Sequence, residues 1–257
     1  LEFRRVLFRS ERANRKYLIK CVTVGIKKYA RKREKEERLE LAQKFHICDG
    51  VLRKYTGKDE RVVIPPCIKC IGENAFEEDV FQGNETITQV VISEGVEIIE
   101  KRAFFSCKNL TSVVIPETVR RIEECAFGQC DNLTSIMIPN GVEKIGDSAF
   151  CDCRSLSSIN IPDSVKKIGD GAFSGCDQLQ EIHLSTDNPN FQVAGTCLID
   201  KRERVLLSGS HFRNVPADSG IHRIANDAFC GSQIITDATI PDGVTAIGDW
   251  VFSGCEN

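Results

Sequence analysis

The thirteen cysteines of this 257-residue chain are the residues most able to do chemistry, because thiols can pair as disulfides, bind metals or act as nucleophiles. Since a recurring position indicates a structural role, we interpret the cysteines that lie three residues after a recurring phenylalanine as a ladder of buried thiols. These are Cys107, Cys130, Cys153, Cys176 and Cys255. A disulfide framework is the alternative, because neighbouring copies could bring two such residues within bonding range, but the other eight cysteines are scattered and the total is odd.

Cys67 and Cys70 form a C-x-x-C pair, a spacing that also occurs in zinc and redox sites. A structural zinc site needs four ligands, and the nearest further candidates are His46 and Cys48, without a second C-x-x-C. We therefore interpret the pair as a coincidence on a surface strand and expect no metal and no cofactor.

Histidines and catalytic motifs give no sign of an active site. His46, His183, His211 and His222 are dispersed, and no spacing among them suggests a triad or a metal site. The sequence contains no phosphate-binding loop, dinucleotide-binding glycine motif, nucleophile elbow or H-E-x-x-H. These observations predict a protein that is not an enzyme, with catalysis kept only as a distant alternative.

The chain repeats itself every 23 residues, and this period determines the fold that we expect. Four units follow one another without a gap, starting at Ile87, Leu110, Leu133 and Leu156, and partial copies flank them. Aligned, they reduce to L-x-x-I-x-I-P-x-x-V-x-x-I-G-x-x-A-F-x-x-C-x-x. Copies that stack on one another predict a solenoid, because no single unit can bury its own apolar face.

Each part of the consensus predicts a local structure. L-x-x-I-x-I is typical of a short strand with Leu110, Val113 and Ile115 inward and Ser112 and Val114 outward. The proline that follows ends this strand, V-x-x-I is a second extended piece, and A-F-x-x-C is expected to close the coil as one helical or 3₁₀ turn. Stacking should then align one phenylalanine per coil in a single row: Phe76, Phe104, Phe127, Phe150, Phe173, Phe229 and Phe252.

The motif I-P-x-x-V-x-x-I-G-x-x-A-F-x-x-C at this period resembles the BspA-type leucine-rich repeats of bacterial surface and host-interaction proteins. The resemblance covers residues 45–257. It implies a mostly β, curved leucine-rich repeat solenoid with short helical turns and a parallel β-sheet on one face. It also implies binding of proteins or matrix components, a cell-surface or secreted location, and no catalytic residue. Segments near 45–63 and 191–214 break the period, and we interpret them as β-hairpin inserts that extend or cap the stack.

Both ends of the chain differ from the repeats. Residues 1–10 resemble a translated sequencing adapter, as in a fragment of environmental DNA, and are excluded from the fold. Residues 11–44 predict a basic helical lead segment or linker, and residues 11–45 hold 12 Lys and Arg against 5 Asp and Glu. The last repeat stops at Asn257, where the next leucine is due, which predicts that the solenoid is truncated at its C-terminus.

The outward positions of the first strands are the candidate binding surface, because strands hold side chains in a pre-organised array. They form two columns of mostly small, uncharged residues: Gln89, Ser112, Ser135, Ser158 and Glu181, and beside them Val91, Val114, Met137, Asn160 and His183. This composition favours a protein or peptide partner, and the acidic body of the chain disfavours nucleic acid. No apolar run is long enough to predict a membrane span.

Two functional hypotheses follow. The first is a protein-binding scaffold, such as a bacterial cell-surface adhesion or host-interaction module. The second is a sensor or spacer arm for an effector domain encoded upstream. The outward columns are the binding surface under the first hypothesis. The alternative for these columns is that they only face solvent and that the binding site lies on the hairpin inserts or in sequence beyond that given.

Overall fold

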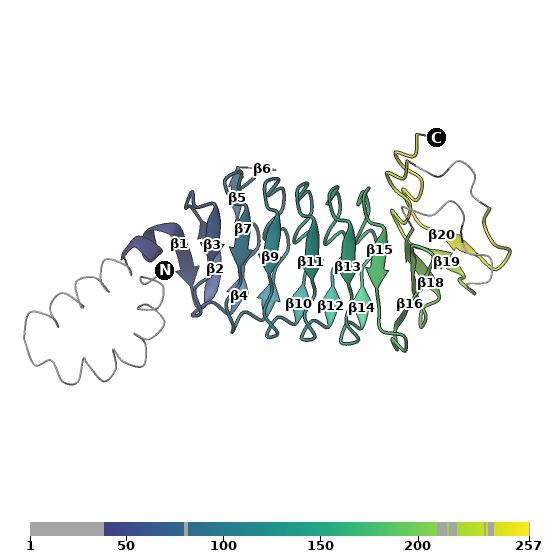
Figure 1. Cartoon of the computed structure of the whole chain (residues 1–257), viewed down its shortest axis with the longest axis horizontal. Helices are drawn as coiled ribbons and strands as arrows, with labels where there is room; N and C mark the ends of the chain where they lie inside the picture. The colour runs from purple at the N-terminus through teal and green to yellow at the C-terminus, as the bar shows by residue number, and fades with distance from the viewer. Residues whose placement is uncertain are drawn as a thin grey trace, which may run out of the picture. The chain divides into compact units, whose positions relative to one another are not determined.

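The computed structural model describes residues 39–79, 82–209, 215, 220–233, 235 and 239–256, so residues 1–10 and most of the expected lead segment lie outside the described part. Residues 39–44 are helical and belong to a unit that ends at Lys44. The chain from Phe45 onward forms a second unit, a β-solenoid of about eight turns, as the period predicts (Figure 1). Within the described residues, no helix has the length and apolar character needed to cross a bilayer.

One row of strands comes from the first extended segment of each coil. Two parallel sheets of three strands form this row, and β9 lies beside β11 where the two sheets meet. Because partners are one repeat apart, equivalent side chains lie side by side. The strands are β3 (Arg61–Val63), β7 (Gln89–Val91), β9 (Ser112–Val114), β11 (Ser135–Met137), β13 (Ser158–Asn160) and β15 (Glu181–His183).

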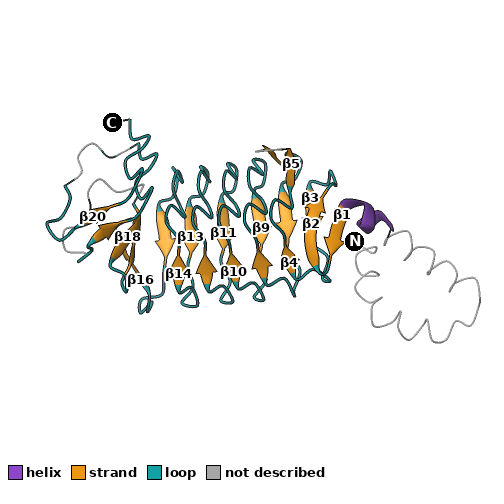
Figure 2. Cartoon of the chain, turned by 180° about the vertical axis from the view of Figure 1, so that it is seen from behind, coloured by secondary structure: helices purple, strands orange, loops and turns teal. Residues whose placement is uncertain are grey.

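A second row forms a seven-stranded sheet (Figure 2). An antiparallel hairpin in the 45–63 segment starts it, and the V-x-x-I segments and their equivalents continue it. Its first pair is antiparallel and its other pairs are parallel. The strands are β1 (Phe45–Cys48), β2 (Val51–Tyr55), β4 (Cys70–Ile71), β8 (Ile98–Ile99), β10 (Arg121–Ile122), β12 (Lys144–Ile145) and β14 (Lys167–Ile168). A small antiparallel pair, β5 (Glu77–Asp79) and β6 (Gln82–Gly83), extends from one coil.

Residues 191–208 of the second expected insert form antiparallel strands that start a separate five-stranded sheet. The strands, in their order across the sheet, are β16 (Phe191–Ala194), β17 (Cys197–Asp200), β18 (Val205–Ser208), β19 (Arg223–Ile224) and β20 (Ala246–Ile247). The pairs β18–β19 and β19–β20 are parallel again, so the repeat pattern resumes after the insert.

The same spacing of apolar residues recurs in each coil and produces a continuous apolar interior. Leu110, Val119 and Phe127 are fully buried, as are the equivalent residues of the next coil. The proline after the first strand accepts a backbone hydrogen bond from the residue three positions later, as Pro116 does from Val119 (3.2 Å), and this turns the chain toward the second strand. Ser112 and Val114 point outward, as the alternation predicts.

The A-F-x-x-C segment forms successive tight turns and not the helical or 3₁₀ turn that the sequence suggests. Cys125 and Gln129 have left-handed φ values of 53° and 59°, which interrupt a helix and direct their backbone N–H groups along the stack. Cys125, Phe127 and Gln129 donate to carbonyls of the next coil at 2.7–3.0 Å. These turns therefore form a third hydrogen-bonded ladder between coils.

The phenylalanine row is also different from the single row that the sequence suggests. Phe76 to Phe173 stack at 4.5–5.8 Å, Phe45 and Tyr55 extend this row upstream, and Phe229 and Phe252 form a separate pair 5.6 Å apart. The insert separates the two groups, because the N–H of Gly209 donates to the carbonyl of Ala228 (2.8 Å). In a regular coil, the equivalent carbonyl accepts from the phenylalanine N–H of the preceding coil, as Ala172 O does from Phe150 N–H.

Gly141 lies where two coils approach closely, which gives a stability prediction. A Cβ at this position would lie 1.9 Å from the carbonyl oxygen of Glu117, so Gly141→Ala must displace backbone and should cost about 1–3 kcal/mol of unfolding free energy. Gly243 has the same place in a later coil but a contact of 3.5 Å only, so Gly243→Ala is the matched control. Urea denaturation measures both, and equal effects would argue against the close approach.

Candidate functional site

The ten predicted surface residues lie on the outward side of the first-strand row, in two parallel lines. Strand pairing places Gln89 beside Ser112, and Ser135 beside Ser158 and then Glu181. In the second line, Val91 pairs with Val114, and Met137 with Asn160 and then His183. All ten are exposed except Val91 and Ser158, which are partly exposed.

The second line is apolar at one end. Val114 is 58% exposed and Met137 is 75% exposed, although side chains of this kind are usually buried in a folded protein. Val63 on β3 continues the line beside Val91 and is 51% exposed. Four neighbouring strands thus present an exposed apolar stripe, which we call the valine–methionine stripe: Val63, Val91, Val114 and Met137.

The first line is polar and carries charges only near its ends. Arg61 lies at one end beside Gln89, and Glu181 lies at the other, where its carboxylate is 3.1 Å from Nε2 of His183. Between them are the small side chains of Ser112, Ser135 and Ser158. A partner therefore meets little steric hindrance over the centre of this surface.

Arg61 and Val63 belong to this surface but were not predicted. Their unit departs from the 23-residue spacing, which obscured its equivalence to the others. The signal was nevertheless present, because Arg61-Val-Val-Ile-Pro65 matches Ser112-Val-Val-Ile-Pro116 residue by residue apart from its first position.

The cysteine column forms the buried thiol ladder that the repeat predicts, except that Cys255 in the last coil is only partly buried. Cys107, Cys130, Cys153 and Cys176 are fully buried, and no described cysteine is in a disulfide. Each thiol from Cys130 onward donates to the phenylalanine carbonyl of the preceding coil, as Cys153 Sγ does to Phe127 O (3.1 Å) and Cys255 Sγ to Phe229 O (3.3 Å). Burial raises the pKa of Cys107 and Cys153 to about 12, so these thiols are neutral.

The C-x-x-C pair does not lie on a surface strand as a whole. Cys67 is exposed, whereas Cys70 begins β4 and is buried, as is Ile71 after it. Burial and the neighbouring Glu100 raise the pKa of Cys70 to about 12, which keeps the thiol protonated. Within the described residues, no three His, Cys, Asp or Glu side chains are placed to hold a metal ion. His211 lies outside these residues.

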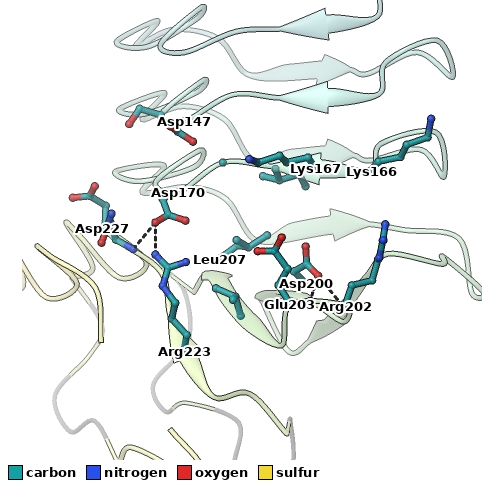
Figure 3. Close-up of a pocket in the computed structure, with 15 residues that line it drawn as sticks. Asp147, Lys166, Lys167, Asp170, Asp200, Arg202, Glu203, Leu207, Arg223 and Asp227 are labelled. Carbon is teal, nitrogen blue, oxygen red and sulfur yellow. Dashed lines mark hydrogen bonds and ion pairs between the residues drawn. The ribbon is translucent and has the colours of Figure 1, made fainter. Parts of the chain in front are cut away.

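A cleft of about 700 Å³, which the sequence did not indicate, lies where the insert interrupts the second strand row (Figure 3). β14 and the turn after it form one wall, and residues of β17, β18 and β19 form the others. Its size is typical of ligand-binding clefts, which measure about 300–1,000 Å³. The broken period at 191–214 was the only sequence signal for it, since the cleft depends on how distant segments meet.

Both signs of charge occur on each side of the cleft, but basic groups outnumber acidic ones on one side and acidic groups outnumber basic ones on the other. Lys166, Lys167 and Arg202 lie on the first side with Asp200 and Glu203, and Asp147, Asp170 and Asp227 lie on the second with Arg223 (Figure 3). The guanidinium of Arg223 contacts Asp170 Oδ2 at 2.6 Å, and this ion pair joins the two sides of the interruption. Burial, and then the nearby Asp170 and Asp249, raise the pKa of Asp227 above its ordinary value.

The described lining of the cleft is rich in charged side chains. It includes the hydroxyl of Ser148 but no histidine or cysteine. Asp200 is committed to structure, since its Oδ1 accepts the backbone N–H groups of Arg202 and Glu203 at 2.8 Å.

Comparison with known families matches six copies of the BspA type leucine rich repeat region to residues 74–194 and 203–257. The two matched ranges are separated by part of the insert that borders the cleft. A comparison with curated proteins gives no match.

Several solved bacterial structures share the fold. A leucine-rich repeat protein from T. pallidum is 24% identical with a TM-score of 0.56, over 83% of this chain and 87% of the other. A leucine-rich cell surface protein from Faecalibacterium prausnitzii is 23% identical with a TM-score of 0.54, over 82% and 72%. A leucine-rich repeat protein from Bacteroides ovatus is 24% identical with a TM-score of 0.54, over 82% of this chain but 55% of the other.

Proposed function

Because the chain belongs to the BspA-type leucine-rich repeat family, we propose that it is a non-enzymatic scaffold that binds a protein or peptide through the outward face of its first-strand row. The observation that carries this proposal is the valine–methionine stripe, which exposes apolar side chains on four neighbouring strands. Contiguous apolar surface of this kind is characteristic of sites that a partner covers.

The polar line beside the stripe supports the same function. Interfaces typically have an apolar centre with a polar rim, and Ser112, Ser135 and Ser158 provide hydroxyl groups along one side of the stripe. The strands hold both lines in fixed register, so little conformational entropy is lost when a partner binds. A cell-surface setting is part of the proposal, since one similar structure is described as a cell surface protein.

Substitution of Met137 tests this function. In Met137→Arg, a charge replaces the most exposed apolar side chain of the stripe, and the affinity for the partner should fall about 30-fold or more if Met137 is a hot spot. The immobilised protein is incubated with host-cell and bacterial extracts, and mass spectrometry identifies the retained proteins. Their affinities are then measured individually.

Asn140→Arg is the matched control, because Asn140 is exposed in the same coil but lies in the turn after Pro139 and off the strand face. At least one protein should be retained by the wild type and by this control and lost from Met137→Arg. If Met137→Arg retains every protein with unchanged affinity, the outward face is not the binding surface.

A further inference from the structure

The second strand row has a regular backbone ladder in which each coil supplies two carbonyls to the next coil. The donor residues are always three positions apart and the distances are 2.8–3.0 Å. The bonds run from Arg120 to Glu97 and Glu123 to Ile99, from Glu143 to Arg120 and Gly146 to Ile122, and from Lys166 to Glu143 and Gly169 to Ile145. Each coil therefore provides the hydrogen-bond acceptors to which the next coil pairs.

The ladder stops at β14. The equivalent carbonyls of Lys166 and Ile168 accept no hydrogen bond from the described part of the chain. The same pattern resumes later, where His222 donates to Arg204 (3.0 Å) and Ala225 to Leu206 (2.9 Å). β18 cannot fill the gap, since β17 and β19 occupy its two edges. Within the described residues, one edge of a parallel sheet is therefore left without a partner strand.

The cleft lies at this free edge. Lys166, Lys167 and Ile168 contribute to its wall, together with Val205 and Leu207 of β18. Ile168, Val205 and Leu207 are buried and form the apolar floor of the cleft. An exposed row of strand carbonyls is a template for an added strand, and peptides that bind in this way gain affinity from backbone hydrogen bonds. The missing coil thus leaves both the acceptors and the space for an extended segment.

We propose that this cleft binds an extended peptide segment of a partner protein as an additional strand parallel to β14, with an acidic residue first and a Lys or Arg four positions later. In this arrangement, the N–H of the acidic residue donates to Lys166 O and the N–H three positions later donates to Ile168 O. An aliphatic residue between them faces the interior, as the isoleucine of V-x-x-I does in the regular coils.

Charge determines the direction and sequence of the peptide. An added parallel strand starts beside Lys166, Lys167 and Arg202, where Glu203 and the hydrogen-bonded Asp200 leave a net positive charge (Figure 3). It ends beside Asp170 and Asp227, where Arg223 pairs with Asp170 and the net charge is negative. Neighbouring coils already pair opposite charges at these two positions, as Glu143 and Lys166 do at 3.0 Å and Lys101 and Glu124 at 2.8 Å. A peptide with the reverse order of charges would place like charges together at both ends.

A labelled peptide tests the proposal by fluorescence anisotropy. The probe is fluorescein-labelled Val-Glu-Ser-Ile-Ser-Arg, in which Glu and the second Ser supply the two N–H groups. We expect saturable binding below about 1 mM, and at least about tenfold weaker binding of the same peptide with both of these amides N-methylated, since it loses two hydrogen bonds. The charge-reversed peptide Val-Arg-Ser-Ile-Ser-Glu should also bind at least about tenfold more weakly.

Protein variants locate the site. Lys167→Glu should weaken binding of the probe, whereas Lys108→Glu makes the same charge change on an exposed residue three coils away and should leave it unchanged. Met137→Arg should also bind the probe normally, which separates this site from the proposed function. The proposal is overturned if the probe does not bind, if N-methylation has no effect, or if the protein instead forms a dimer that Lys167→Glu dissociates.

Discussion

Replacing Phe150 with alanine should cost about 3–5 kcal/mol of unfolding free energy, because the ring is fully buried and the stack can relax only partly around the cavity. The ring stacks on Phe127 at 5.4 Å and on Phe173 at 5.8 Å, with interplanar angles of 1° and 5°. Urea denaturation followed by circular dichroism gives the free energy.

Phe252→Ala is the control for this prediction. Phe252 is 37% exposed and stacks only on Phe229, so its removal should cost less than half as much. A cost below about 1 kcal/mol for Phe150→Ala, or equal costs for the two variants, would contradict the stacked interior.

Alkaline pH should destabilise the protein strongly through the buried thiols. Their pKa values lie above the ordinary value of 9.0 in the folded protein, to about 12 for Cys107, Cys153 and Cys197, because burial disfavours the thiolate. Cys130 and Cys176 are shifted in the same direction by the same cause. Below pH 9 the thiols are protonated in both states, so their contribution to stability is constant.

Between pH 9 and 12 the unfolded chain loses these protons before the folded protein does, so the free energy of unfolding falls as the pH rises. Each thiol contributes about 1.4 kcal/mol per pH unit, so the three thiols with a pKa of about 12 together remove about 4 kcal/mol at pH 10. Cys130 and Cys176 act in the same direction. Denaturation in the presence of a reductant at pH 8, 9 and 10 measures the decline. Cys153→Ala should make it shallower by the share of one thiol, and a stability that is unchanged from pH 8 to pH 10 would refute the titration.

Much of the architecture could be predicted from the sequence because the period constrains every copy at once. The repeat predicts that Val113 and Phe127 point inward and that Val114 points outward, and the structure confirms these orientations. The tight turns at A-F-x-x-C could not be predicted, because they depend on residues with left-handed φ values, such as Cys125. Cysteine is not a residue type that favours this conformation.

The effect of the second insert on the stack could not be predicted from the sequence for another reason. Its strands were expected to extend or cap the stack without interrupting it. Gly209 instead donates to the Ala228 carbonyl, which in a regular coil would accept from a phenylalanine N–H, and the aromatic row divides there. The cleft at β14 arises from the same event. Its lining joins residues as distant as Asp147 and Asp227, and pattern alone does not bring such residues together.

The central claim is that neighbouring coils stabilise one another through in-register side chains, and a double-mutant cycle on Phe127 and Phe150 tests it most directly. Removing both rings should cost less than the sum of the single changes, by about 0.5–1.5 kcal/mol, because either single change already abolishes their mutual contact. The same cycle on Phe76 and Phe150, which are not neighbours in the row, should give additive costs. Additive costs for Phe127 and Phe150 would contradict the stacked solenoid.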